Sequence, residues 1–84
     1  NNMELRVVGP NQTEIELSDG NRFFFSYNTL VAAYLVGRGY IKSKRFYSKT
    51  TSSHINAWIH TACDVLDQDE FDNLTKLTVS VKEN

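Results

Sequence analysis

Residues 40–58 have the sequence YIKSKRFYSKTTSSHINAW, and the spacing of apolar side chains changes within them. Up to Ser48, aromatic, β-branched and basic residues mix as they do in strands. Beyond that point, apolar residues recur at the three- and four-residue spacing of an amphipathic helix: Ile55, Trp58, Ile59, Ala62, Cys63 and Leu66. The serines and threonines between the two patterns are typical helix caps. We therefore expect a strand over 40–48 and a helix that begins near Thr50.

Upstream of this segment, the pattern is typical of strands joined by short turns. The expected strands are residues 5–8, 13–17 and 22–27, and the expected turns are residues 9–12 and 18–21, which contain glycine. Residues 30–36 form an apolar run that periodicity alone cannot assign, and we favour a strand over a short helix. With residues 40–48 these segments predict an antiparallel meander of about five strands.

Three consecutive phenylalanines, Phe23, Phe24 and Phe25, lie in the third expected strand. Successive side chains of a strand point to opposite faces of the sheet, so Phe24 cannot share a face with its two neighbours. Both faces of the sheet must therefore be covered at this strand. The available covers are a curled sheet, the helices and a second subunit.

Residues 67–77 predict a second helix, with acidic residues in its first turn and Phe71, Leu74 and Leu77 on one side. The polar residues 78–84 are expected either to fray or to add a strand over 78–81. With 84 residues, 40% of them hydrophobic, the composition is that of one globular domain. We predict a single α+β domain, a curved antiparallel sheet followed by one or two C-terminal helices.

Bulk properties indicate a cytoplasmic protein. The single cysteine, Cys63, cannot form an intrachain disulfide, which favours a reducing compartment. No apolar run approaches the ~20 residues that cross a bilayer, so we expect no membrane partner. A chain this short buries a thin core, which keeps a homo-oligomer open as an alternative.

The net charge is only −1, but the charges are sorted along the chain. Residues 38–62 hold five Lys and Arg and no Asp or Glu, whereas residues 63–84 are acidic. A basic strand that runs into a helix N-terminus, with hydroxyls beside it, predicts a site for phosphate, a nucleotide or nucleic acid. Its candidate residues are Lys42, Lys44, Arg45, Tyr47, Lys49, Thr50, Thr51 and His54. The structural alternative is a capped helix beside a solvated strand.

Other chemistry finds little support in the sequence. His54 and His60 are six residues apart and do not form a helical metal pair, so we expect no metal and no cofactor. Cys63 is expected on the apolar side of the helix, where burial makes a thiol unreactive. Since no serine has the surroundings of a nucleophile elbow, we expect a noncatalytic protein rather than a small hydrolase.

Two motifs resemble a family of small phage and plasmid proteins of unknown function. The first is Ser26-Tyr27-Asn28-Thr29, and the second is Tyr47-Ser48-Lys49-Thr50-Thr51-Ser52-Ser53-His54-Ile55-Asn56. The resemblance covers roughly residues 14–77, and Ser53 stands where the family commonly carries a basic residue. It implies an origin in a phage or other mobile element, in the cytoplasm of a bacterial host, and it implies no activity.

These observations favour a noncatalytic binding protein that acts on a host protein or a defence component. Exposed aromatic residues and the acidic C-terminal third are the expected contacts, namely Tyr34, Tyr40, Asp69 and Glu70. The alternative is a nucleotide or nucleic-acid binding protein that uses the basic strand and the helix start.

Overall fold

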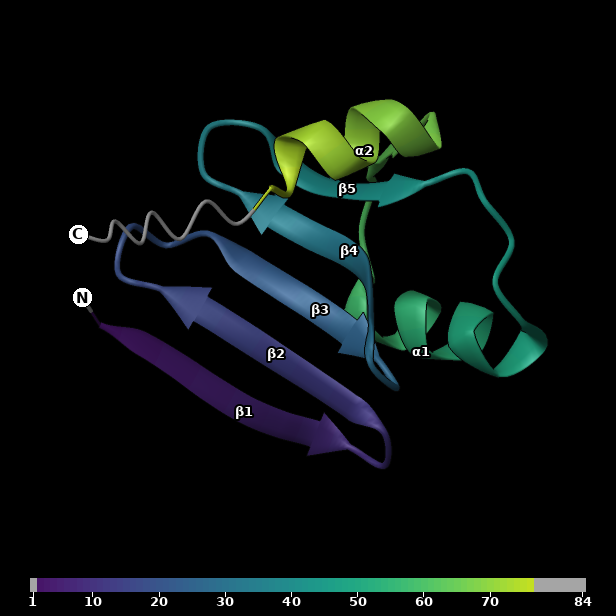
Figure 1. Cartoon of the computed structure of the whole chain (residues 1–84), viewed down its shortest axis with the longest axis horizontal. Coiled ribbons are helices and arrows are strands. Elements are labelled where there is room, and N and C mark those ends of the chain that lie inside the picture. Colours follow the sequence, from purple (N-terminus) through teal and green to yellow (C-terminus); the bar gives the residue numbers. More distant parts are fainter. Residues whose placement is uncertain (1, 77–84) are drawn as a thin grey trace, which may run out of the picture.

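The computed structural model describes residues 2–76, which form one six-stranded sheet with a helix on each face (Figure 1). The strands follow chain order across the sheet: β1 (Met3–Gly9), β2 (Gln12–Leu17), β3 (Arg22–Ser26), β4 (Thr29–Leu35), β5 (Gly39–Ser43) and β6 (Asp64–Leu66). β1 to β5 form an antiparallel meander, and β6 lies parallel to β5. Helix α1 (Lys49–Trp58) connects β5 to β6, and α2 (Gln68–Leu74) follows β6. The predicted α+β fold is confirmed, as is a strand rather than a helix over most of residues 30–36.

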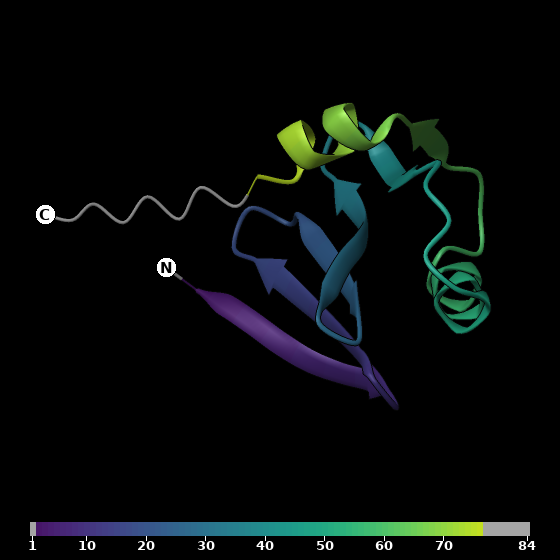
Figure 2. The same cartoon turned by 45° about the vertical axis from the view of Figure 1, so that its right-hand side comes forward.

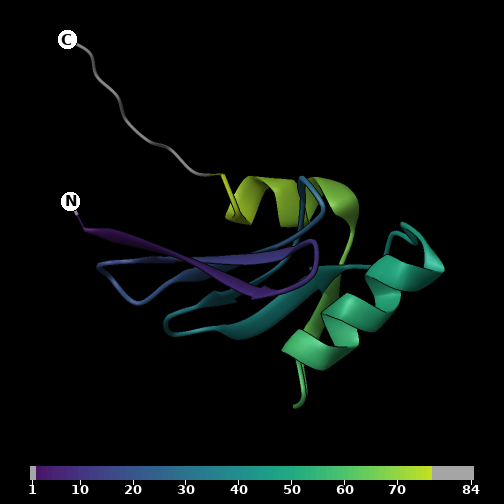
Figure 3. The same cartoon turned by 90° about the horizontal axis from the view of Figure 1, so that it is seen from below.

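The two helices cover opposite faces of the sheet, which Figure 3 shows edge-on. We name these the α1 face and the α2 face. The α2 face holds a buried cluster of Phe23, Ala33, Ile41, Leu66 and Phe71. The α1 face holds a second buried cluster of Phe24, Val31, Ala32, Ile55 and Ile59. The three phenylalanines of β3 are therefore divided between the faces, as their positions predicted.

A bulge in β4 fits the strand to these two clusters. Phe24 pairs with Ala32 and Phe25 pairs with Leu30, so Val31 is left without a partner in β3. An extra residue of this kind shifts the alternation of side chains by one. Val31 and Ala32 can therefore both face α1, while Leu30 packs against the cluster on the α2 face.

Helix α1 begins where the serine-rich segment predicted. Ser48 has extended backbone dihedrals, and its Oγ accepts a hydrogen bond from the backbone N–H of Thr51 at 3.0 Å. This bond satisfies one of the amide groups that a helix start leaves without a partner. Ile55 on the buried side of α1 then packs on the sheet.

The extent of the elements after residue 40 differs from the prediction. β5 ends at Ser43 rather than at 48, and α1 ends at Trp58 rather than near Leu66. Residues 64–66, which we expected in the first helix, form β6. Cys63 is a half-buried residue before that strand and does not lie on a helix. The second helix is confirmed but spans only residues 68–74, and the expected strand over 78–81 lies outside the described residues.

The error over 59–66 has a physical cause. Apolar residues at 59, 62, 63 and 66 match a helical spacing, yet a three-residue strand is too short to show its own alternation. β6 forms because Asp64, Val65 and Leu66 pair with β5, and Leu66 fills the α2 face at 8% exposure. That pairing joins residues more than twenty positions apart, which local periodicity does not report.

Removal of the Ser48 cap tests how α1 is started. We expect Ser48→Ala to lower the free energy of unfolding by about 1 kcal/mol, because the amide of Thr51 loses its acceptor. Ser53→Ala in the exposed middle of α1 is the matched control and is expected to be neutral. Urea unfolding followed by fluorescence of the single Trp58 measures both, and an equal loss in the two variants would contradict the cap.

Candidate functional site

The α2 face of β1 is apolar and exposed, and the neighbouring residues of β2 on that face are half-buried. Register places Met3 beside Leu17 and Leu5 beside Ile15, so these side chains share one face. The exposed fractions of Met3, Leu5 and Val7 are 64%, 62% and 75%. Helix α2 contacts β5 rather than β1 or β2. Figure 2 shows β1 at the edge of the sheet away from that helix. This region therefore has the composition of a buried face without a cover among the described residues.

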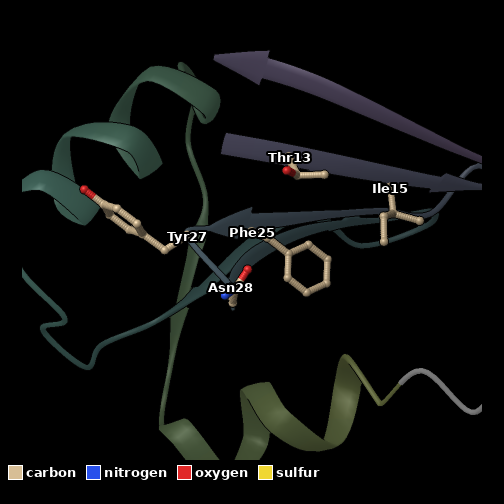
Figure 4. A pocket seen from close by; sticks show the side chains of 5 residues that line it. All are labelled: Thr13, Ile15, Phe25, Tyr27 and Asn28. Carbon is tan, nitrogen blue, oxygen red and sulfur yellow. The ribbon is translucent and has the colours of Figure 1, made fainter. Parts of the chain in front are cut away.

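A shallow pocket of about 280 Å³ lies on the same face, over β2 and β3 (Figure 4). Ile15 and Phe25 form its apolar walls, and Thr13 and Asn28 bring a hydroxyl and an amide to it. This volume is at the lower end of the range for small-molecule sites, roughly 300–1,000 Å³. We name the surface around it the open face, which consists of Met3, Leu5, Val7, Thr13, Ile15 and Phe25.

Tyr27, at the tip of the β3–β4 hairpin, borders this pocket in an uncommon backbone conformation. Its φ is +57°, a region that residues other than glycine rarely occupy. Two contacts hold it there. Its N–H donates to the carbonyl of Asn11 at 2.7 Å, and its ring centroid lies 5.9 Å from that of His54. Half of its surface is exposed, and its ring is turned toward α1, away from Ile15 and Phe25 (Figure 4).

Ser26 joins the hairpin to helix α1. Its Oγ lies 2.9 Å from Thr51 Oγ1 and 2.8 Å from His54 Nδ1. A serine beside a histidine has the spacing of a nucleophile and its base. At 1% exposure, however, this oxygen offers a substrate no access, and it already has two partners. The arrangement therefore locks α1 against the β3–β4 hairpin.

Glu14 is the centre of the polar contacts on the α1 face. Its carboxylate accepts hydrogen bonds from Trp58 Nε1 at 2.8 Å and from Arg6 Nη2 at 2.9 Å, and Arg22 lies 3.9 Å away. Arg6 also pairs with Glu4 at 3.0 Å and with Glu16. The ring of Trp58 stacks on Phe24 with centroids 5.0 Å apart. Ion pairs and hydrogen bonds of Glu14 thus connect β1, β2 and β3 to helix α1.

These contacts set the charge of Glu14. Burial by itself raises the pKa of the carboxyl group, but the hydrogen bonds from Trp58 and Arg6 and the positive charge of Arg22 outweigh burial. The pKa is therefore lowered from its usual value of 4.5. Hydrogen bonds to Glu14 and Glu16 raise the pKa of the Arg6 guanidinium. Both groups remain charged at neutral pH.

A second hollow of about 370 Å³ lies between α1 and the β5–β6 edge of the sheet. We name it the basic groove, and its lining consists of Lys42, Ser43, Lys44, Arg45, Phe46, Ser52, Ile55, Asn56 and Val65. Three cations of the predicted phosphate site gather there. Phe46 beside them is 72% exposed. Lys44 is paired with Asp67 at 3.0 Å, which offsets part of the positive charge.

The other residues of the predicted phosphate site do not line the groove. Thr51 and His54 bind Ser26. Lys49 and Thr50 are exposed at the start of α1. Tyr47 is half-buried, and its hydroxyl donates to the side chain of the glutamine that begins α2, at 3.3 Å. The helix start is therefore used for structure, and the cations before it form the accessible surface.

The predicted protein contacts are divided between the two faces of the sheet. Tyr34 and Tyr40 are half-buried on the α1 face, where the Arg22 guanidinium lies 4.7 Å from the Tyr34 ring and donates to the Tyr40 hydroxyl at 3.0 Å. Asp69 and Glu70 are exposed on α2, on the other side of the sheet. These four residues therefore do not form one surface.

Comparison with known proteins gives one match: the model of a family of unknown function (DUF8033) matches residues 3–73. The chain belongs to this family. The matched range runs from the first residue of β1 to the penultimate residue of α2, so it contains every element of the DUF8033 fold described above. Neither a curated protein nor a solved structure matches the chain.

Within residues 2–76, no group of three or more His, Cys, Asp or Glu is placed to hold a metal ion. Among the helices described for this DUF8033 protein, none has the length and apolar composition needed to span a bilayer.

Sequence reasoning missed the groups that organise the DUF8033 fold at this site. The alternation of β2 predicted that Glu14 and Ile15 point to opposite faces of the sheet, which is confirmed, but it gave no partner for the carboxylate of Glu14. Trp58 is 44 residues away in the chain, so no local pattern could link the two. Nor did the sequence mark Tyr27, because a tyrosine with positive φ leaves no compositional signal. A usable signal existed for Ser26, since it is part of the first motif.

The lowered pKa of Glu14 predicts how stability depends on pH. Because the folded state favours the carboxylate, its contribution is present above pH 4.5 and is lost as pH falls through the lowered pKa. We expect Glu14→Gln to be less stable at pH 7 and to lose less of its stability on acidification. Urea unfolding at several pH values measures this. Glu70→Gln, which removes an exposed carboxylate from α2, should keep the wild-type dependence, and an unchanged slope in Glu14→Gln would contradict the assignment.

Proposed function

We propose that the protein is a noncatalytic binding protein that docks another protein against the open face. The observation that carries this proposal is the exposure of Met3, Leu5 and Val7 beside one another on one face of the sheet. Contiguous exposed apolar surface is uncommon on soluble proteins and marks sites of protein interaction. A partner that covers the open face removes this apolar area from water.

The distribution of charge on β1 and β2 supports this reading. Charged side chains of these strands lie on the α1 face, where Arg6 forms ion pairs with Glu4 and with Glu14. Antiparallel sheets usually turn the apolar face toward a cover and the polar face toward water. In β1 and β2 the polar side carries the ionic contacts, and the apolar side is the one that no helix within residues 2–76 covers. The pattern is that of a face built to be buried.

The pocket on the open face supplies an anchoring point. Ile15 and Phe25 can enclose an aliphatic or aromatic side chain of the partner, while Thr13 and Asn28 can form hydrogen bonds at its edge. Binding energy at protein interfaces is concentrated where such anchors fill desolvated pockets.

We infer further that the partner is a host protein or a defence component in the cytoplasm of a bacterial host. The support for this step is the resemblance of the motifs at 26–29 and 47–56 to small phage and plasmid proteins. We expect such a binding protein to act by occupying a surface of the host machinery.

A substitution within the open face tests the proposal. Capture from bacterial lysate identifies partners, and the affinity of each purified partner for the wild-type protein is then measured. We expect Thr13→Arg to weaken binding at least about tenfold, because it places a charge in the pocket. Thr61→Arg in an exposed loop makes the same change elsewhere and should bind as the wild type does. A partner insensitive to Thr13→Arg would remove the open face as its site.

The second candidate function is binding of single-stranded nucleic acid in the basic groove. Lys42, Lys44 and Arg45 there can follow a phosphate backbone, and the exposed ring of Phe46 can stack on a base. This candidate is favoured by the gathering of three cations beside one exposed aromatic ring. The pairing of Lys44 with Asp67 counts against it, because the carboxylate repels phosphate.

Salt dependence tests this second candidate. If the groove binds nucleic acid, affinity for a labelled oligonucleotide should fall steeply as salt rises. The logarithm of the binding constant should fall with the logarithm of the salt concentration, with a slope of roughly −0.7 for each phosphate contacted. The double variant Lys44→Ala, Arg45→Ala should then bind at least about tenfold more weakly. Lys49→Ala is the matched control, because Lys49 lies outside the groove lining and its loss should have little effect. No binding at low salt would eliminate this function.

A further inference from the structure

The outer edge of β1 is the longest free edge of the sheet among the described residues. The sheet ends in β1 at one side and in β6 at the other, and these strands have seven and three residues. An edge strand presents backbone N–H and C=O groups that can pair with another strand. Proteins commonly block such edges with lysine, proline or very short strands. β6 is short, whereas β1 contains neither lysine nor proline, and the irregularity in its register lies at its end, between Val7 and Gly9.

The side chains of β1 alternate in a way that complements a second copy of the same strand. Met3, Leu5 and Val7 lie on the open face, and Glu4 and Arg6 lie on the α1 face. In an antiparallel pair the residue numbers of partners have a constant sum. A two-fold axis perpendicular to the sheet keeps each residue on its own face, so one residue must lie opposite itself.

The three central registers place Glu4, Leu5 or Arg6 at the axis. Only one of them gives every residue from Met3 to Val7 a compatible partner. With Glu4 at the axis, the two Glu4 carboxylates face each other, and with Arg6 at the axis the two guanidinium groups do. With Leu5 at the axis, Leu5 meets Leu5 and Met3 meets Val7 on the open face. On the α1 face Glu4 then meets Arg6 twice, once at each side of the axis. Opposite charges across strands are favourable, whereas like charges directly opposite destabilise a pair.

We propose that β1 pairs antiparallel with β1 of a second copy of this chain, with Leu5 opposite Leu5 of that copy. The resulting dimer has one continuous sheet with six strands from each molecule. Pairing satisfies the outer backbone groups of β1 and brings the two open faces together into one apolar surface. The proposal stands on the edge of β1, so it is independent of whether a host protein docks on the face.

Disulfide formation reads the register directly. In a Cys63→Ser background, which removes the single native thiol, Leu5→Cys is expected to form a covalent dimer under mild oxidation. Val7→Cys is the matched control on the same face of the same strand. In the proposed register the two Val7 positions are four residues apart along the strands, roughly 14 Å. That separation exceeds the ~7 Å between Cα atoms that a disulfide spans. A mixture of Met3→Cys and Val7→Cys should cross-link.

A charge reversal tests the same register without cysteine. Sedimentation over a concentration series gives the dimer dissociation constant of the full chain. Glu4→Lys should raise the dissociation constant about tenfold or more, because in each copy the new lysine then faces Arg6 of the other copy. Asp69→Lys on α2 makes the same charge change far from β1 and should leave the dimer unchanged. Circular dichroism confirms that each variant is folded.

The outcomes separate the proposal from its competitors. A folded wild-type chain that stays monomeric at all concentrations would overturn the proposed β1–β1 dimer. The edge of β1 would then be available only to a strand of a different protein. Cross-linking of Val7→Cys in preference to Leu5→Cys would overturn the register. Thr13→Arg, placed on β2 and not on the edge, should keep the dimer even where it abolishes docking of a host protein. Failure of the dimer and failure of the proposed function are therefore distinguishable.

Discussion

The buried carboxylate of Glu14 is the group on which the arrangement of the sheet depends. A charge at 7% exposure is tolerated only when it is paired and hydrogen-bonded. Glu14 takes its partners from three elements: Arg6 of β1, Arg22 of β3 and Trp58 of α1. One side chain thereby fixes which face of β1 turns toward α1. Because the charged residues are held on that face, the apolar residues of β1 and β2 are committed to the other.

The open face then follows from the dimensions of the elements. Neighbouring strands lie about 4.8 Å apart, so six strands span roughly 24 Å from the first to the last. Helix α2 has seven residues and is only about 10 Å long and about 10 Å wide. It can cover less than half of such a sheet, and it packs near β5. In the part of the chain that the structure describes, the strands at the far edge therefore have no helical cover on the α2 face, even though their sequence alternates as for burial.

The sequence predicted those parts of the fold whose signal is local. The alternation of β2, the glycine turns and the division of Phe23 and Phe24 between two faces depend on residues close together in the chain, and all are confirmed. The predicted end of α1 was wrong, and β6 was not predicted, because both depend on pairing with a distant strand. Leu66 satisfied a helical stripe in the sequence, but its burial in the structure comes from β5 and α2.

The same distinction applies to the candidate sites. Lys42, Lys44 and Arg45 lie in one groove because they are near neighbours in the chain, so sequence reasoning brought them together. The open face could not be predicted in this way. The alternation at Met3 and Leu5 predicts a buried face, and only the position of α2 reveals that the described residues leave this face exposed. That alternation also puts opposite charges on the reverse side of β1. A single seven-residue strand thus determines both the surface offered to a partner and the edge offered to a second copy.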